Sequence, residues 1–280
     1  MKTYTHEDGA LRLNPCSYGV SQLTFRGPQR QTDGRFVLFL GGSDTFGRYV
    51  PEPFSHLIEF ETGETCVNLG CQAAGPDVYL KDSTIQALCQ DASVTVIQVI
   101  GATNLTNAYY KVHPRRNDRF IAPTKLLTEL YSEVDFTEFS FTGHLISRLR
   151  ALDEARFELV RCCLQATWKT RMEALISQIS GPVLLLWFAS RPATGAMHLA
   201  LHETDPNTDP NSEPLFVTAE MIEGLRGAVS DVIEVVSDRG EMNGMSFAQL
   251  DFLAAYDSLG IAAHRAAAAA LHGPLSARLS

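Results

Sequence analysis

A glycine-rich turn that carries one serine lies between an apolar run and a segment with helical spacing. The turn reads GGSDTFG, residues 41–47, and directly follows FVLFL. Gly41 and Gly42 permit backbone angles that other residues rarely adopt, and the amides that follow can face a developing negative charge. Ser43 is therefore a candidate nucleophile. The alternative is a plain strand-to-helix turn in which Ser43 or Asp44 caps the next helix.

Two further segments have a similar composition and also follow apolar runs. They read VNLGCQAAG, residues 67–75, and VIGATNLTN, residues 99–107. In an open parallel sheet the ligand site lies beyond the carboxyl ends of the strands. If the three apolar runs are neighbouring parallel strands, the three turns meet at one edge of the sheet.

This set of turns resembles the SGNH hydrolase superfamily, also called GDSL esterases and acetyltransferases. In that superfamily the first strand ends in the nucleophile block, the second supplies a glycine amide to the oxyanion hole, and the third supplies an Asn side chain. The resemblance implies that Ser43 is the nucleophile and that Gly70 and Asn104 stabilise the oxyanion, with Asn107 as a competitor for the Asn position. It also implies that a late histidine serves as the base.

Two positions depart from the superfamily pattern. Gly42 stands where the first block has Asp, and Ile261 stands where an Asp precedes the catalytic histidine. His264 is the best match to that histidine, and Asp257 is the nearest acid. A serine without an oriented base is a weak nucleophile, so the missing Asp argues against hydrolase chemistry. The alternative for His264 is a structural role at the start of the last helix.

A basic segment follows the third apolar run and reads NAYYKVHPRRNDRF, residues 107–120. Arginine forks bind carboxylate, phosphate or sulfate, and tyrosines stack on sugar rings, so the segment is a candidate ligand site. The alternative is a solvated loop in which Asp118 pairs with an arginine. His113 is an alternative base for Ser43. The candidate substrate-binding residues are Gly42, Asn107, Tyr109, His113, Arg115 and Arg116. The chain as a whole is also similar to an alphaproteobacterial family of unknown function that carries the glycine-serine turn and an HPRRNDRF-like segment.

Composition limits the partners and cofactors. The 280 residues include 23 Lys and Arg against 32 Asp and Glu, a formal charge of −9, which argues against nucleic-acid and membrane binding. The six cysteines are too irregularly spaced for a zinc site or a disulfide framework. His198 and His202 have helical spacing but no third ligand, and no dinucleotide or P-loop motif is present. We expect no metal and no cofactor, and a cytoplasmic protein; the oligomeric state is left open.

The order of elements predicts an α/β fold of three layers, αβα, flavodoxin-like or SGNH-like. Near-continuous apolar runs are typical of parallel strands that are buried on both faces. We expect five parallel strands in the order 2-1-3-4-5, at residues 36–40, 65–70, 94–101, 182–190 and 231–237. Helical spacing predicts helices over residues 51–61, 77–90, 123–131, 137–150, 153–180, 218–229 and 261–272.

One domain with two additions is expected. Residues 1–30 form an N-terminal arm, and residues 31–280 form a single SGNH-like domain with a helical insertion over 120–180; residues 202–214 read as an exposed loop. The function favoured by the resemblance is a serine-dependent ester hydrolase or O-acyltransferase that acts on an acylated saccharide. The alternatives are a non-catalytic module that binds a saccharide or an anionic metabolite, and a sulfotransferase-like group-transfer enzyme.

Overall fold

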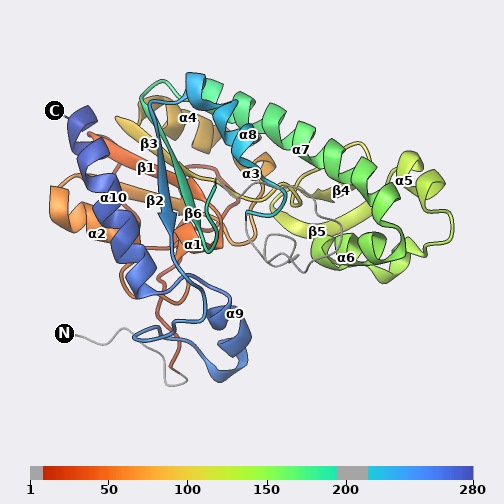
Figure 1. Cartoon of the computed structure of the whole chain (residues 1–280). Coiled ribbons are helices and arrows are strands. Elements are labelled where there is room, and N and C mark those ends of the chain that lie inside the picture. Colours follow the sequence, from red (N-terminus) through yellow and green to blue (C-terminus); the bar gives the residue numbers. More distant parts are fainter. Residues whose placement is uncertain (1–8, 194–213, 280) are drawn as a thin grey trace.

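A five-stranded parallel sheet forms the centre of the molecule (Figure 1). The computed structural model describes residues 9–193 and 214–279. The strand order is β2-β1-β3-β6-β7, which confirms the predicted sheet. The strands are β1 (Phe36–Gly41), β2 (Thr65–Gly70), β3 (Val94–Gln98), β6 (Val183–Ala189) and β7 (Asp231–Val236).

Both faces of the sheet are buried, which explains the lack of polar alternation in the strand sequences. In β1, Phe36, Leu38 and Leu40 pack into one core cluster, whereas Val37 and Phe39 pack into the other. Successive side chains of a strand point to opposite faces, so this split places apolar layers on both sides. The three-layer αβα architecture is therefore confirmed.

Helices cover the two faces of the sheet (Figure 1). On one face lie α2 (Phe54–Thr62) and α10 (Ile261–Leu279), which contact each other. Because α10 continues through Pro274, it is longer than the predicted helix 261–272. The other face is covered by α3 (Asp77–Leu80), α4 (Ser83–Asp91), α7 (Glu154–Ser177) and α8 (Ala219–Glu223), the last followed by a 3-10 turn at Arg226–Ala228.

The basic segment forms a β-hairpin, which corrects the expectation of a loop. Its antiparallel strands are β4 (Tyr110–His113) and β5 (Arg116–Pro123). Tyr110 and Val112 are buried while Lys111 is exposed, so the segment has the two-residue period of a half-buried strand. The predicted helical insertion therefore begins with strand. Beyond it come α5 (Lys125–Leu130), a 3-10 turn at Phe136–Glu138 and α6 (Thr142–Leu152).

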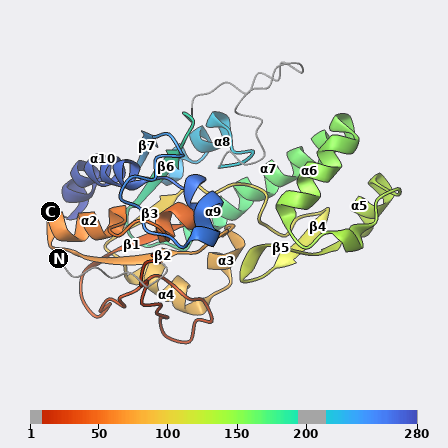
Figure 2. The ribbon, with the colours of Figure 1, turned by 90° about the horizontal axis from the view of Figure 1, so that it is seen from below.

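The hairpin, α5 and α6 lie toward the end of α7 that is farther from the sheet (Figure 2). Residues 9–30 run along the side of the molecule where α4 lies (Figure 2), and Tyr18, Leu23 and Phe25 join the core cluster that also contains α4 and α7 residues. In the same segment the buried Arg26 donates hydrogen bonds to the carbonyl oxygens of Gly47 and Pro51. Among the helices described, none combines the length and apolar character needed to cross a membrane.

Candidate functional site

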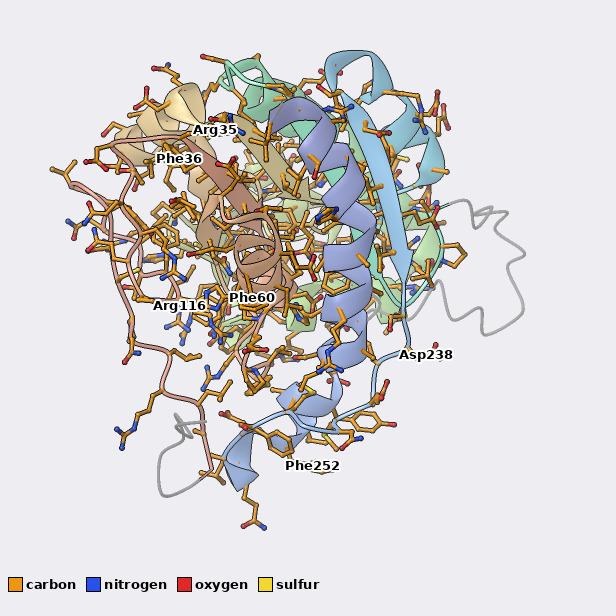
Figure 3. The ribbon with its side chains drawn as sticks, turned by 90° about the vertical axis from the view of Figure 1, so that its left-hand side faces the viewer. Arg35, Phe36, Phe60, Arg116, Asp238 and Phe252 are labelled. Carbon is orange, nitrogen blue, oxygen red and sulfur yellow. The ribbon has the colours of Figure 1, made fainter. Side chains whose placement is uncertain are left out.

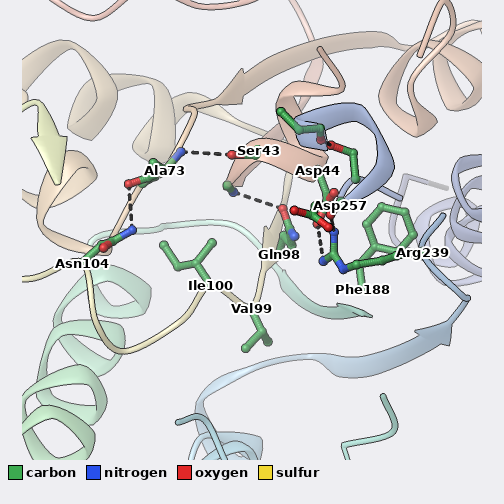
Figure 4. A pocket seen from close by; sticks show the side chains of 14 residues that line it. Ser43, Asp44, Ala73, Gln98, Val99, Ile100, Asn104, Phe188, Arg239 and Asp257 are labelled. Carbon is green, nitrogen blue, oxygen red and sulfur yellow. Dashed lines mark hydrogen bonds and ion pairs between the residues drawn. The ribbon is translucent and has the colours of Figure 1, made fainter. Parts of the chain in front are cut away.

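The carboxyl edge of the sheet brings the three polar turns together. Gly41 at the end of β1 is the register partner of Gly70 at the end of β2, and Leu40 pairs with Ile97 of β3. A cleft of about 370 Å³ opens at this edge (Figure 4). The polar residues in its lining are Ser43, Asp44, Gln98, Asn104, Arg239, Asp257 and Ser258, together with the backbone of Gly42 and Ala73 and the ring of Phe188.

Ser43 is the first residue of the short helix α1 (Ser43–Phe46) and is exposed to the cleft. Its Oγ accepts a hydrogen bond of 3.1 Å from the backbone N–H of Ala73. Ala73 has φ 52, a left-handed conformation that turns this amide toward the serine. The N–H of Gly70 instead donates to Asn68 Oδ1 at 2.8 Å. The backbone amide that contacts Ser43 is therefore that of Ala73. It lies three residues after Gly70, whose amide the resemblance indicated.

Asn104 lines the cleft in a fixed orientation. Its Nδ2 donates to the carbonyl oxygen of Ala73 at 3.2 Å (Figure 4). Its Oδ1 accepts from the hydroxyl of Thr142 at 2.6 Å. Thr142 begins α6, so the insertion holds a cleft residue in place. Asn107 is used elsewhere, because its Oδ1 accepts the N–H groups of Tyr109 and the next residue. Of the two Asn candidates, the structure places Asn104 in the cleft.

The side chain of Gln98 holds the glycine-rich turn in place through hydrogen bonds. Its Oε1 accepts hydrogen bonds from Gly42 N–H at 3.0 Å and Thr45 N–H at 3.1 Å, and a third from the Thr45 hydroxyl at 2.5 Å. The Gly42 amide is therefore committed to the turn itself and is not available to a ligand. The side-chain Nε2 of Gln98 remains as a donor on the cleft side, because no described residue accepts from it. A polar residue inside the otherwise apolar stretch VIQVI, residues 96–100, was the sequence signal for this role.

An ion pair forms the far wall of the cleft. Arg239, which follows β7, donates to Asp44 Oδ2 at 3.2 Å and to the carbonyl oxygen of Asp257. The other carboxylate oxygen of Asp44 accepts the N–H of Leu259 at 3.2 Å. Asp44 therefore connects the glycine-rich turn to the loop between α9 (Phe252–Tyr256) and α10. A 3-10 turn at Gln249–Asp251 precedes α9. The partners of Asp44 lie in these later segments, so the expected capping of the first helix by Asp44 is not the role it takes.

His264 is a core residue. It is 1% exposed and packs against Phe54, with ring centroids 5.6 Å apart, and against Phe188 at 5.3 Å. Its Nδ1 accepts the N–H of Phe54 at 3.1 Å, so the neutral imidazole carries its proton on Nε2. A base for Ser43 needs an unprotonated nitrogen facing the hydroxyl. The expected catalytic role of His264 does not fit this arrangement; the imidazole caps the first amide of α2.

Burial strongly disfavours the charged form of this imidazole. Burial, and then the nearby charge of Arg26, lower the pKa of His264 to about 3. The unfolded chain binds this proton near pH 6.5. The contribution of His264 to the free energy of unfolding is therefore fully present above that pH, and it falls as the pH drops toward about 3.

Acid should therefore weaken the fold through His264. Between pH 7.5 and pH 5 this residue alone should remove about 2 kcal/mol from the free energy of unfolding. Urea unfolding of the wild type and of His264→Phe at both pH values measures this, because the variant lacks the titrating group. The wild type should lose about 2 kcal/mol more than the variant over this interval. Equal losses would show that His264 titrates normally in the folded protein.

The hairpin residues line a different cavity from the one expected. His113, Arg115 and Arg116 border a neighbouring cavity of about 650 Å³, which meets the Ser43 cleft at Ala73. The Nδ1 of His113 accepts the N–H groups of both arginines at 3.2 Å, so the histidine stabilises the hairpin turn. Neither His113 nor Tyr109 lies in the lining of the Ser43 cleft.

No group of three His, Cys, Asp or Glu side chains is arranged to hold a metal ion in residues 9–193 and 214–279. His198, His202 and the expected exposed loop 202–214 lie outside these ranges except for Pro214. The sequence did not single out Ala73 or Arg239 as site residues. The position of Arg239 just after a parallel strand was the available signal, because ligand-binding loops follow such strands.

Comparison with known proteins gives a distant structural match and a family. One structural match is a carbohydrate esterase family 2 enzyme with a carbohydrate-binding domain from Corynascus thermopiles (Myceliophthora fergusii), with a TM-score of 0.42 and 11% identity, over 91% of this chain and 69% of that one. No curated protein matches in sequence. The model of one family matches residues 1–279, and the chain therefore belongs to that family, the domain of unknown function DUF6473.

Proposed function

We propose that the Ser43 cleft binds a saccharide, and that the protein is a binding module rather than a serine hydrolase. The observation that carries this proposal is the hydrogen bond from Phe54 N–H to His264 Nδ1, which places the imidazole proton on Nε2, so that neither nitrogen of His264 is free to take a proton from Ser43. The hydrogen bond at Ser43 Oγ comes from the amide of Ala73 and not from a histidine. A serine hydroxyl is almost wholly protonated at neutral pH, so without a base it acts as a hydrogen-bonding group.

The chemistry of the cleft lining supports a sugar ligand. The cavity is lined by polar side chains of three kinds: the hydroxyls of Ser43 and Ser258, the amide groups of Gln98 and Asn104, and the carboxylate of Asp257. These groups are suited to sugar hydroxyls, each of which both donates and accepts hydrogen bonds. The side chains of Ala73, Val99, Ile100 and Ala254 add apolar atoms to the lining, and the buried ring of Phe188 lies behind them. A few polar groups on an apolar wall are typical of small-molecule sites.

A second candidate is the serine-dependent hydrolysis or transfer of an acyl group from a saccharide ester. It is favoured by the contact of Ala73 N–H with Ser43 and by the nearby amide of Asn104, donors that could stabilise an oxyanion. In this reaction Ser43 Oγ would attack the acyl carbon, its proton would pass to the carboxylate of Asp257, and the sugar hydroxyl would leave with that proton. A carboxylate is a weaker base than an imidazole and a poor acceptor for a serine proton, which places this candidate second.

Ser43→Trp should abolish saccharide binding, and Ser43→Ala should weaken it about fivefold, the effect of one hydrogen bond of about 1 kcal/mol. Ser43 is exposed, so both variants should fold. Binding to an array of neutral and acidic glycans, followed by titration calorimetry with those that bind, measures both effects.

Ester chemistry is tested on the same proteins. The wild type should turn over p-nitrophenyl acetate no faster than Ser43→Ala does, and a fluorophosphonate probe should leave Ser43 unlabelled. Turnover that is lost in both Ser43→Ala and Asp257→Asn would establish the second candidate in place of the first.

A further inference from the structure

The cavity beside the Ser43 cleft is built from three separate parts of the chain. Its walls come from the N-terminal segment at Gln22 and Thr24, from the loop after β2 at Gln72 and Ala73, and from the hairpin turn. Figure 3 shows Arg116 on the same side of the molecule as the N-terminal segment, away from Asp238, which follows β7. With volumes of about 370 and 650 Å³, both cavities are large enough for parts of one small ligand.

Two adjacent cations of the hairpin turn are left without a carboxylate partner. Arg115 and Arg116 are exposed, and neither forms an ion pair within residues 9–193 and 214–279. Asp118, the partner that the sequence suggested, lines the same cavity but makes no ion pair with them. By contrast, Arg239 in the Ser43 cleft is paired with a carboxylate. The excess positive charge at this edge of the sheet therefore lies in the second cavity.

The hairpin turn is attached firmly to the loop that separates the two cavities. Asn117 is 1% exposed; its Oδ1 accepts the N–H of Gly75 at 2.9 Å and its Nδ2 donates to the carbonyl oxygen of His113 at 2.9 Å. His113 in turn binds the amides of Arg115 and Arg116. The backbone that carries both arginines is thus held at a defined position relative to Ala73, which reduces the cost of ordering them around a ligand.

We infer that this second cavity binds the anionic group of an acidic saccharide, a carboxylate or a sulfate, while a neutral part of the same molecule occupies the Ser43 cleft. Guanidinium groups bind both anions through paired hydrogen bonds. This inference rests on the proposed saccharide binding and adds the class of saccharide. The meeting of the cavities at Ala73 requires a ligand of more than one sugar unit, or one sugar with an extended acidic substituent.

The test compares acidic glycans with their neutral counterparts on the full chain. The array should contain uronic-acid, sialic-acid and sulfated glycans, each beside the same glycan without the charged group. The wild type should bind acidic members preferentially. The double variant Arg115→Gln/Arg116→Gln should lose about tenfold or more in affinity for them and change affinity for neutral glycans by less than about twofold. Arg265→Gln, an exposed arginine on α10, is the matched control and should behave as the wild type.

The outcomes separate this inference from the proposed function. If glycans bind and Ser43→Trp removes that binding, but charge makes no difference and the double variant has no effect, the acidic subsite is wrong and saccharide binding stands. If the wild type binds no glycan, or if Ser43→Trp binds as well as the wild type, the proposed function itself is contradicted. Comparison of uronic-acid with sulfated members identifies which anion the arginines prefer.

Discussion

Gly75→Ala is expected to abolish saccharide binding and to lower the free energy of unfolding by about 3 kcal/mol, an upper value for overpacking. A Cβ atom at position 75 would lie 1.6 Å from the carbonyl oxygen of Asn104 and 2.7 Å from its carbonyl carbon. These are backbone atoms, so the clash cannot be relieved by rotating a side chain. The loop after β2 and the loop after β3 would have to separate, and Asn104 and Ala73 would lose the contact that shapes the cleft.

Gly143→Ala is the matched control for this substitution. A Cβ atom there meets nothing within 4 Å, and Gly143 lies in α6 next to Thr142. Because alanine favours helix over glycine, this variant should be stabilised by about 0.5–1 kcal/mol and should bind saccharide normally. Urea unfolding and calorimetry on both variants measure the effects. Normal binding by Gly75→Ala would mean that the two loops do not meet as closely as the structure shows.

His264→Ala should lower the free energy of unfolding by about 3 kcal/mol. The substitution empties a site between Phe54 and Phe188 and leaves the Phe54 N–H at the start of α2 without its acceptor. Removal of a buried aromatic group creates a cavity, and the lost hydrogen bond adds about 1 kcal/mol. The midpoint of urea unfolding at pH 8 measures the loss when the imidazole is neutral.

His264→Phe separates the two contributions. It fills the site again but accepts no hydrogen bond, so it should be intermediate between the wild type and His264→Ala. Saccharide affinity, measured well below the unfolding midpoint, should stay within about twofold for both variants, because His264 does not line the cleft. A His264→Ala protein as stable as the wild type would contradict the structural role.

The sheet could be predicted from the sequence because burial on both faces leaves a simple signal. Runs such as FVLFL and PVLLLWFAS cannot be exposed on either side, and their alternation with helices indicates parallel strands in a doubly wound order. The hairpin was missed because its charges dominate the segment. Lys111, Arg115 and Arg116 suggested a solvated loop, while the shorter alternation of Tyr110 and Val112 carried the strand signal.

The sequence predicted where the site lies in the fold, but not which atoms of the site contact one another. The sequence indicated that the turns at Ser43 and Asn104 meet, because the ends of parallel strands share an edge. It could not indicate which amide faces Ser43, since Ala73 reaches it through a positive φ that alanine rarely adopts. It also could not tell whether His264 faces the cleft or the core, because that depends on the rotation of α10 against α2.

The central claim is that a saccharide occupies the cleft between Ser43 and Asn104. The most direct measurement is a ¹H–¹⁵N correlation spectrum recorded while the tightest-binding glycan from the array is added. The account predicts that the shifts concentrate on the backbone amide of Ala73 and the side-chain amides of Gln98 and Asn104, with resonances in α10 unchanged. Shifts confined to other surfaces, with Ala73, Gln98 and Asn104 unmoved at saturation, would contradict it.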